Sequence, residues 1–308
     1  MDKVTLTPRP QAVACTVPAD EVKRVKGLGC LRDKRTADCF NVRVLTRNGI
    51  LTADEQIALA QAAEKFGSGK IGITTRQTME IQSVPYGNLE ALFAFLKQYG
   101  LESGGTGPKV RPVVSCKGTS CSFGLIDTYG LSLKIHEKFY VGYHQVALPH
   151  KFKIGVGGCP NNCVKPDLND FGVVGQFVPS VEEDKCRACA KCQIIEGCPI
   201  HAARMENGKV FIDPEKCNHC GRCVGKCPFK AVEQGYVAYK VTIGGRWGKK
   251  VAIGRPLTQL LTSEEQVLQV LERAILLFRD EGMAGERFSD TIERLGFEYV
   301  NDKLLSDL

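Results

Sequence analysis

The sequence contains neither a long apolar run nor an export-type N-terminus. No apolar segment approaches the roughly 20 residues that a transmembrane helix needs. Residues 1–20 show no basic region followed by an apolar block, so they do not resemble a secretory signal. We therefore expect a cytoplasmic protein without a membrane span.

Two further patterns are missing, and each excludes a class of partner. No basic run is interleaved with aromatic residues, which argues against a nucleic acid partner. No Gly-x-Gly-x-x-Gly follows a predicted strand at the start of a helix, so the chain has no fingerprint for a flavin or nicotinamide. The net charge of +7 instead suits a small anionic ligand.

Cysteine, in contrast, is abundant, with 15 residues in a chain of 308. Because nothing points to export, metal ligation is favoured over disulfide bonds. Two dense runs end in Cys-Pro, and they read Cys186-x2-Cys189-x2-Cys192-x5-Cys198 and Cys217-x2-Cys220-x2-Cys223-x3-Cys227. Zinc, the alternative, would favour two Cys-x2-Cys pairs over triplets that each have a remote fourth cysteine.

This spacing is typical of two-cluster ferredoxins, in which the fourth cysteine of each run binds the other cluster. We therefore predict two [4Fe-4S] clusters within residues 179–238. The first would be held by Cys186, Cys189, Cys192 and Cys227. The second would be held by Cys198, Cys217, Cys220 and Cys223. The predicted role of this block is electron transfer.

Four more cysteines form two spaced pairs, Cys116-x4-Cys121 and Cys159-x3-Cys163. Together they could hold a third cubane cluster, with flanking glycines that let backbone N–H groups approach its sulfurs. The alternative is a set of buried free thiols. The remaining cysteines lack ligand spacing and are predicted to be ordinary thiols, and these are Cys15, Cys30 and Cys39.

Hydrophobic periodicity divides the chain into two α/β parts. We expect residues 1–38 to be irregular, and residues 41–100 to form strand, helix, strand, strand, helix. Capping patterns at Thr52–Glu55 and Thr262–Glu265 predict helices to Phe66 and to about Arg279. A linker is expected at 101–108, and a last helix and strand at 285–298. The predicted domains are 1–100, 101–178 with 239–308, and an inserted 179–238.

Three motifs then make the sequence resemble a known family. They are Thr74-Thr-Arg76-Gln-Thr78, Leu148-Pro-His-Lys151-Phe-Lys153 and Gly158-Cys159-Pro-Asn-Asn-Cys163. The chain resembles the sirohaem-dependent sulfite and nitrite reductases. Within them it is most similar to the anaerobic sulfite reductases, in the subunit that has an inserted two-cluster ferredoxin module. The dissimilatory sulfite reductases share that insertion.

This resemblance implies an α+β fold with three parts. They are a ferredoxin-like half domain, a sirohaem- and cluster-binding domain, and an inserted two-cluster ferredoxin domain. One departure from the family is the pair Cys116-x4-Cys121, since the family usually shows Cys-x5-Cys.

The resemblance also implies roles for individual residues. Cys116, Cys121, Cys159 and Cys163 would hold a [4Fe-4S] cluster, with Cys163 as the axial thiolate of sirohaem. The basic substrate-binding residues would be Arg43, Arg76, Lys151 and Lys153, with Arg47 as the alternative to Arg43. Without the motif, the lysines would be read as a solvated strand edge.

The implied function is the six-electron reduction of sulfite to sulfide, with electrons from a separate flavoprotein or ferredoxin. Reduction of nitrite to ammonia at the same site is one alternative. Others are an electron-transfer subunit without sirohaem, and a protein that binds sulfite without turnover. Because family members often use two related halves and this chain holds one, we expect a homodimer or a hetero-oligomer.

Overall fold

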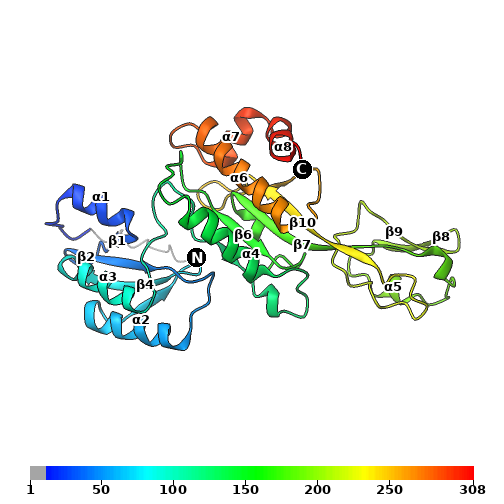
Figure 1. Cartoon of the computed structure of the whole chain (residues 1–308), viewed down its shortest axis with the longest axis horizontal. Helices are drawn as coiled ribbons and strands as arrows, with labels where there is room; N and C mark the ends of the chain where they lie inside the picture. Colours follow the sequence, from blue (N-terminus) through cyan, green and yellow to red (C-terminus); the bar gives the residue numbers. More distant parts are fainter. Residues whose placement is uncertain (1–11) are drawn as a thin grey trace, which may run out of the picture. The chain divides into compact units, whose positions relative to one another are not determined.

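The computed structural model describes residues 12–308, and the chain divides after Pro112 into two compact units (Figure 1). Unit 1 contains an antiparallel four-stranded sheet in the order β1-β2-β4-β3. Its strands are β1 (Cys30–Arg32), β2 (Cys39–Val44), β3 (Ile71–Ile73) and β4 (Met79–Pro85). Its helices are α1 (Ala19–Gly27), α2 (Ala53–Phe66) and α3 (Leu89–Gln98).

Helix α2 begins and ends where the sequence predicts. Thr52 accepts a hydrogen bond from the Glu55 backbone N–H, and the Glu55 carboxylate accepts one from the Thr52 N–H, at 3.2 and 2.7 Å. This capping box satisfies two N–H groups that a helix start leaves without partners. The apolar face of α2 then packs into the core of unit 1 against α3, β4 and β3.

The capping box supplies a direct test of this local structure. Replacing Thr52 by alanine should destabilise α2 by about 1 kcal/mol, because the Glu55 N–H loses its partner. Hydrogen exchange of the α2 amides, followed by mass spectrometry, should accelerate accordingly. Thr36, an exposed threonine of the same unit, is the control, and its alanine variant should leave α2 exchange unchanged. Equal exchange in the Thr52→Ala variant and the parent would contradict the assignment.

The expectation that residues 1–38 are irregular is wrong. The described part of residues 1–38 contains α1 and β1, whereas residues 1–11 lie outside the described range. Pro18 directly precedes α1, a position at which proline costs no helical hydrogen bond. The predicted linker, residues 101–108, contains no helix or strand; within it Leu101 is buried and Ser103 forms an isolated bridge with Val44.

Unit 2 is built on a mixed five-stranded sheet in the order β11-β10-β7-β6-β5. Its strands are β5 (Val114–Ser115), β6 (Ile154–Gly157), β7 (Phe171–Pro179), β10 (Gly235–Ile243) and β11 (Arg255–Pro256). Strands β5, β6 and β7 run parallel, and β10 pairs antiparallel with both β7 and β11. The parallel strands therefore place their carboxyl ends at one edge of the sheet.

Helices cover one face of this sheet and the β6–β7 connection covers part of the other (Figure 1). Helix α4 (Thr128–Ile135) continues into a π-helical turn at His136–Val141, and ion pairs join this segment to α6 (Glu264–Glu281). On the opposite face, a Cβ at Gly155 would lie 2.7 Å from Asn169 Nδ2, and a Cβ at Gly157 would lie 3.0 Å from Pro166 Cγ. Glycine at these positions therefore lets the connection lie directly on β6.

The C-terminal prediction is half correct. The expected last helix is α7 (Phe288–Leu295), but the expected strand is a further helix, α8 (Phe297–Leu305). The buried residues of α8 are Phe297, Val300, Asn301 and Leu304, a helical spacing that extends beyond the window read as a strand. Gly296, with φ of +91°, separates the two helices.

Strands β7 and β10 form a ribbon of nine residue pairs, and residues 180–234 lie between them in the sequence. We call these residues the cysteine-rich block. It contains α5 (Gln193–Glu196) and the hairpin of β8 (Ala203–Glu206) and β9 (Lys209–Ile212), which lie beyond the end of the ribbon in Figure 1. Across residues 12–308, no helix is long and apolar enough to cross a bilayer.

Candidate iron–sulfur and anion-binding site

The stretch 148–163 is centred on β6, with its lysines before the strand and its cysteines after it. Cys159 follows β6 and Cys116 follows the parallel neighbour β5, so both lie at the carboxyl edge of the sheet. The register pairs Ser115 with Val156, and the Cys116 N–H donates to Val156 O at 3.1 Å. The fold therefore brings the two cysteine pairs together at this edge.

The four cysteines of this edge interact with one another. Burial raises the pKa of Cys159, and the neighbouring cysteines Cys116, Cys163 and Cys121 raise it further, while the Asn161 N–H lowers it. Cysteine thiolates raise one another's pKa in this way only when their sulfurs lie close together. The Gly158 N–H also donates to Cys116 Sγ at 3.1 Å. Such N–H···S bonds support thiolates that bind an iron–sulfur cluster.

Glycine lets the two cysteine loops approach backbone to backbone. A Cβ on Gly118 would lie 2.9 Å from Gly158 Cα and 2.6 Å from Thr128 Cγ2. Thr128 Oγ1 donates to Cys116 O at 2.8 Å and so ties the start of α4 to the first loop. The Cys116–Cys121 loop, one residue shorter than the family spacing, contains a 3-10 turn at Gly118–Ser120. The short loop thus still presents both of its cysteines beside Cys159.

This donor set fits a cubane cluster better than a single ion. Within residues 12–308, no three His, Cys, Asp or Glu side chains converge on a position for one metal ion. A [4Fe-4S] cluster takes one thiolate at each of four irons, so its cysteines surround a larger group. Cys163 is exposed whereas the other three cysteines are partly buried. The exposure of Cys163 is compatible with a further ligand beside the four cysteines, which the resemblance to sirohaem enzymes implies.

The two lysines are held at the opposite end of β6. Phe152 is fully buried against Phe278 and Phe288, so Lys151 and Lys153 flank a residue that faces the core. The four residues of β6 lie between Lys153 and the bend that carries Cys159, a strand length of about 13 Å at about 3.3 Å per residue. The structure therefore does not bring the lysines of one chain to its own cluster cysteines.

A buried ion pair that sequence reasoning missed anchors the lysine segment. Asp170 Oδ2 accepts the Lys153 backbone N–H at 2.9 Å, and both Asp170 oxygens accept from Arg287 Nη2 at 2.8 and 2.6 Å. Both side chains are almost completely buried. The sequence held one signal for this ion pair: Asp170 is a charged residue directly before the apolar run of β7.

The candidate arginines lie in unit 1. Arg43 on β2 pairs with Glu80 on β4, with Nε and Oε2 3.3 Å apart, and both side chains are about one quarter exposed or less. Arg47 binds Glu55, the residue that completes the capping box of α2. Arg76 lies in the turn between β3 and β4 and donates to Pro112 O. Each candidate guanidinium thus has a partner within unit 1.

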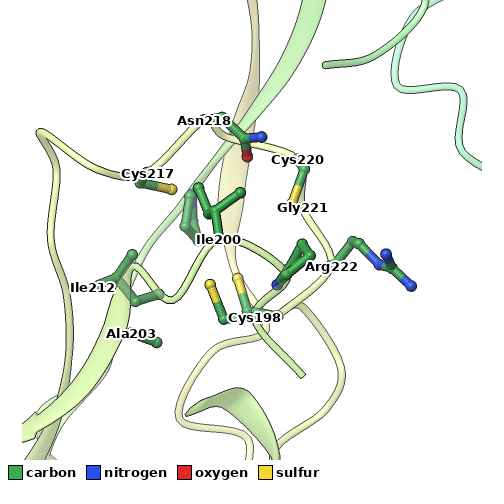
Figure 2. Close-up of a pocket in the computed structure, with 12 residues that line it drawn as sticks. Cys198, Ile200, Ala203, Ile212, Cys217, Asn218, Cys220, Gly221 and Arg222 are labelled. Atoms are coloured by element: carbon green, nitrogen blue, oxygen red, sulfur yellow. The ribbon is translucent and has the colours of Figure 1, made fainter. Parts of the chain in front are cut away.

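In the cysteine-rich block, one hollow gathers the second predicted ligand set. Its lining includes Cys198, Cys217, Cys220 and Cys223. Figure 2 shows the sulfurs of Cys198, Cys217 and Cys220 directed into this hollow, whereas Arg222 points away. Burial raises the pKa of Cys223 to about 11, and the neighbouring Cys217, Cys220 and Cys198 raise it as well. The four residues predicted to share a cluster therefore meet in space.

The first predicted ligand set lies against the small core of the block. Cys186, Cys192 and Cys227 pack beside buried residues that include Ile194 and Val232. The Val210 N–H in β9 donates to Cys186 Sγ at 3.3 Å. Cys189, the fourth member of the set, is partly buried.

The three cysteines without ligand spacing lie in unit 1. Cys30 belongs to its hydrophobic core, and burial raises the pKa of this thiol to about 12. Cys39 is also buried, which raises its pKa, whereas Cys15 is partly buried. Two of the three are therefore neutral core thiols.

Comparison with known proteins assigns this architecture. The nitrite and sulphite reductase 4Fe-4S domain matches residues 106–308, and the nitrite/sulfite reductase ferredoxin-like half domain matches residues 32–99. The fold and its cysteine edge are those of a 4Fe-4S oxidoreductase. The chain belongs to the nitrite and sulfite reductase family, which confirms the resemblance and the sulfite/nitrite reductase fold predicted from the sequence.

Individual relatives agree with this family. An uncharacterised protein of Methanocaldococcus jannaschii is 33% identical and covers 87% of this chain and 91% of that protein. The coenzyme F420-dependent sulfite reductase of the same organism is 30% identical over 86% of this chain, which spans only 42% of that enzyme. One subunit of the anaerobic sulfite reductase of Salmonella typhimurium is 29% identical over 75% of this chain and 72% of its own length.

A solved structure shows the same fold. Dissimilatory sulfite reductase I superposes with a TM-score of 0.71 at 21% identity, covering 88% of this chain and 70% of that one.

Proposed function

We propose that this protein is a sulfite reductase that uses sirohaem and a [4Fe-4S] cluster to reduce sulfite to sulfide. One observation carries the proposal: Cys116, Cys121, Cys159 and Cys163 share the carboxyl edge of β5 and β6, with Cys163 exposed. Its relatives include enzymes named for sulfite reduction. The four cysteines would hold the cluster, and Cys163 would also bind the iron of sirohaem.

When bound, sirohaem would supply the iron position for sulfite and the redox chemistry of its reduction. The chain supplies charge around that position. Arg76 and Arg43 carry fixed charges that suit a bound oxyanion, and Lys151 and Lys153 can also release protons where they are partly desolvated. The two clusters of the cysteine-rich block deliver electrons, which come from a separate flavoprotein or ferredoxin.

The position of the lysines leads us to propose that each active site is shared between two copies of the chain. Lys153 directly precedes β6 and Cys159 lies in the bend that follows it, with about 13 Å of strand between them. A site that needs both must take its lysines from one copy and its cysteines from another. In a two-fold dimer this exchange is reciprocal and forms two equal sites.

The proposal is tested on anaerobically purified protein from a host that makes sirohaem. We expect about twelve irons from three [4Fe-4S] clusters and one more from the tetrapyrrole, which should also give its absorption band. With a reduced dye as donor, sulfite should be converted to sulfide. Faster turnover of nitrite than of sulfite at low concentration would favour the nitrite reductase instead. Twelve irons without tetrapyrrole would identify an electron-transfer subunit.

A further inference from the structure

Two cysteine loops that are distant in the sequence touch each other in unit 2. The loop that follows Cys121 supplies Phe123 and Leu125, and the loop that contains Cys220 supplies Gly221 and Arg222. The Arg222 guanidinium lies 5.6 Å from the centroid of the Phe123 ring. A Cβ on Gly221 would lie 3.5 Å from Leu125 Cδ2, so the Leu125 side chain lies beside the Gly221 backbone. The first loop belongs to the sheet-edge cysteines and the second to the hollow in Figure 2.

Hydrogen bonds continue this contact to a cluster sulfur. The Leu125 N–H donates to Gly158 O at 2.9 Å, and the Gly158 N–H donates to Cys116 Sγ at 3.1 Å. On the other side, Phe177 in β7 forms a bridge with Cys220. A short path of contacts and hydrogen bonds therefore runs from Cys220 to Cys116 through Gly221, Leu125 and Gly158.

The other cysteine set of the block is anchored elsewhere. Cys186 Sγ accepts the Val210 N–H, and Cys186 O accepts from Lys209 Nζ at 3.3 Å, so this loop is tied to β9. The β8–β9 hairpin lies beyond the end of the β7–β10 ribbon, away from β6 (Figure 1). The hairpin also lines the hollow of the second set, through Ala203 and Ile212. The two sets differ instead in their loops: the loop of Cys220 touches the loop that follows Cys121, whereas the loop of Cys186 is tied to β9.

We propose that Cys198, Cys217, Cys220 and Cys223 hold the inner cluster, which exchanges electrons with the cluster at the sheet edge, and that Arg222 and Phe123 are positioning residues that hold the two loops together. The set Cys186, Cys189, Cys192 and Cys227 is then the outer one, which receives electrons from the external donor. Each internal transfer oxidises the inner cluster by one electron and reduces the sheet-edge cluster by one, and no atom moves. The inference rests on the proposed function because it requires both clusters.

Substitution at the contact tests the positioning role. Arg222→Ala and Phe123→Leu should slow reduction of the sheet-edge cluster by the pre-reduced block roughly two- to fivefold, the factor for losing an exposed cation–π contact. Freeze-quench EPR without sulfite measures this rate. Arg222→Lys and Phe123→Tyr keep a cation and a ring and should restore much of it. Both side chains are exposed, so iron content should not change.

A matched control exists within the block. The Arg204 guanidinium lies 4.4 Å from the centroid of the Phe211 ring in the β8–β9 hairpin, outside the contact of the two loops, and it also pairs with Glu206 and Asp213. Arg204→Ala removes a cation–π pair of the same kind and should leave the internal rate unchanged. An unchanged rate in Arg222→Ala and Phe123→Leu, or an equal slowing in Arg204→Ala, would overturn the proposal.

A second experiment separates the inner from the outer cluster by spectroscopy alone. In the reduced protein, the sheet-edge cluster should interact magnetically with a cluster of the block. This interaction should persist in Cys189→Ser and disappear in Cys217→Ser. The opposite pattern would assign the inner position to the other set. The proposed function is tested separately, by sulfite turnover with a dye that reduces the sheet-edge cluster without the block. Loss of the dye-driven reaction with intact magnetic coupling would reject the function and keep the cluster order.

Discussion

A dimer of one Lys153→Ala copy and one Cys163→Ser copy is expected to reduce sulfite, although neither variant does so efficiently alone. In a site shared between copies, the mixed dimer contains one site with both changes and one with neither. Its turnover should therefore reach about half that of the parent dimer. The physical reason is the length of β6, which separates the lysines of one chain from its own cysteines.

Each single variant sets the baseline for this experiment. Removing one preorganised cation from an oxyanion site costs on the order of 100- to 1,000-fold in rate, and Lys153→Ala should show such a loss with its iron and sirohaem content intact. Cys163→Ser should lose the coupling of sirohaem to the cluster. Lys249→Ala, at an exposed position, is the control and should be fully active. If differently tagged copies are purified as mixed dimers and remain inactive, the shared site is refuted.

Replacing Asp170 by alanine should lower the free energy of unfolding by about 3–5 kcal/mol, because Arg287 would keep its charge without a partner in a buried position. The same change removes the acceptor of the Lys153 N–H, so turnover should fall in the fraction that remains folded. Thermal unfolding of the anaerobic holoprotein, followed by circular dichroism, measures the loss of stability.

An exposed pair provides the comparison for Asp170. Arg279 and Asp280 are 2.6 Å apart, with 43% and 55% of their side chains exposed. Because solvent screens such a pair, Asp280→Ala should cost less than about 1 kcal/mol. Similar losses in the two variants would show that the Asp170–Arg287 pair contributes no more than a surface pair.

The sequence by itself predicted the cysteine sets, and it determined the family and most helices. Cluster ligands are close in the chain because short loops must wrap a compact group, so spacing alone reveals them. The start of helix α2 was also predictable from the sequence, because the hydrogen bonds of its capping box join residues three positions apart. Local patterns did not predict α1 or α8. Prolines near α1 suggested irregular structure, and the segment read as a strand was too short to show the helical spacing of α8.

The tertiary structure decided which of these residues share a location. Lys153 and Cys159 belong to one motif-rich stretch, yet a strand carries them to opposite ends of the sheet. Asp170 and Arg287 are separated by 117 positions and meet only after the C-terminal helices pack on the sheet. The contact of Arg222 with Phe123 likewise depends on the β7–β10 ribbon. Spacing specifies groups that are neighbours along the chain, whereas strand direction and long-range packing decide which distant groups meet, and no local pattern encodes these.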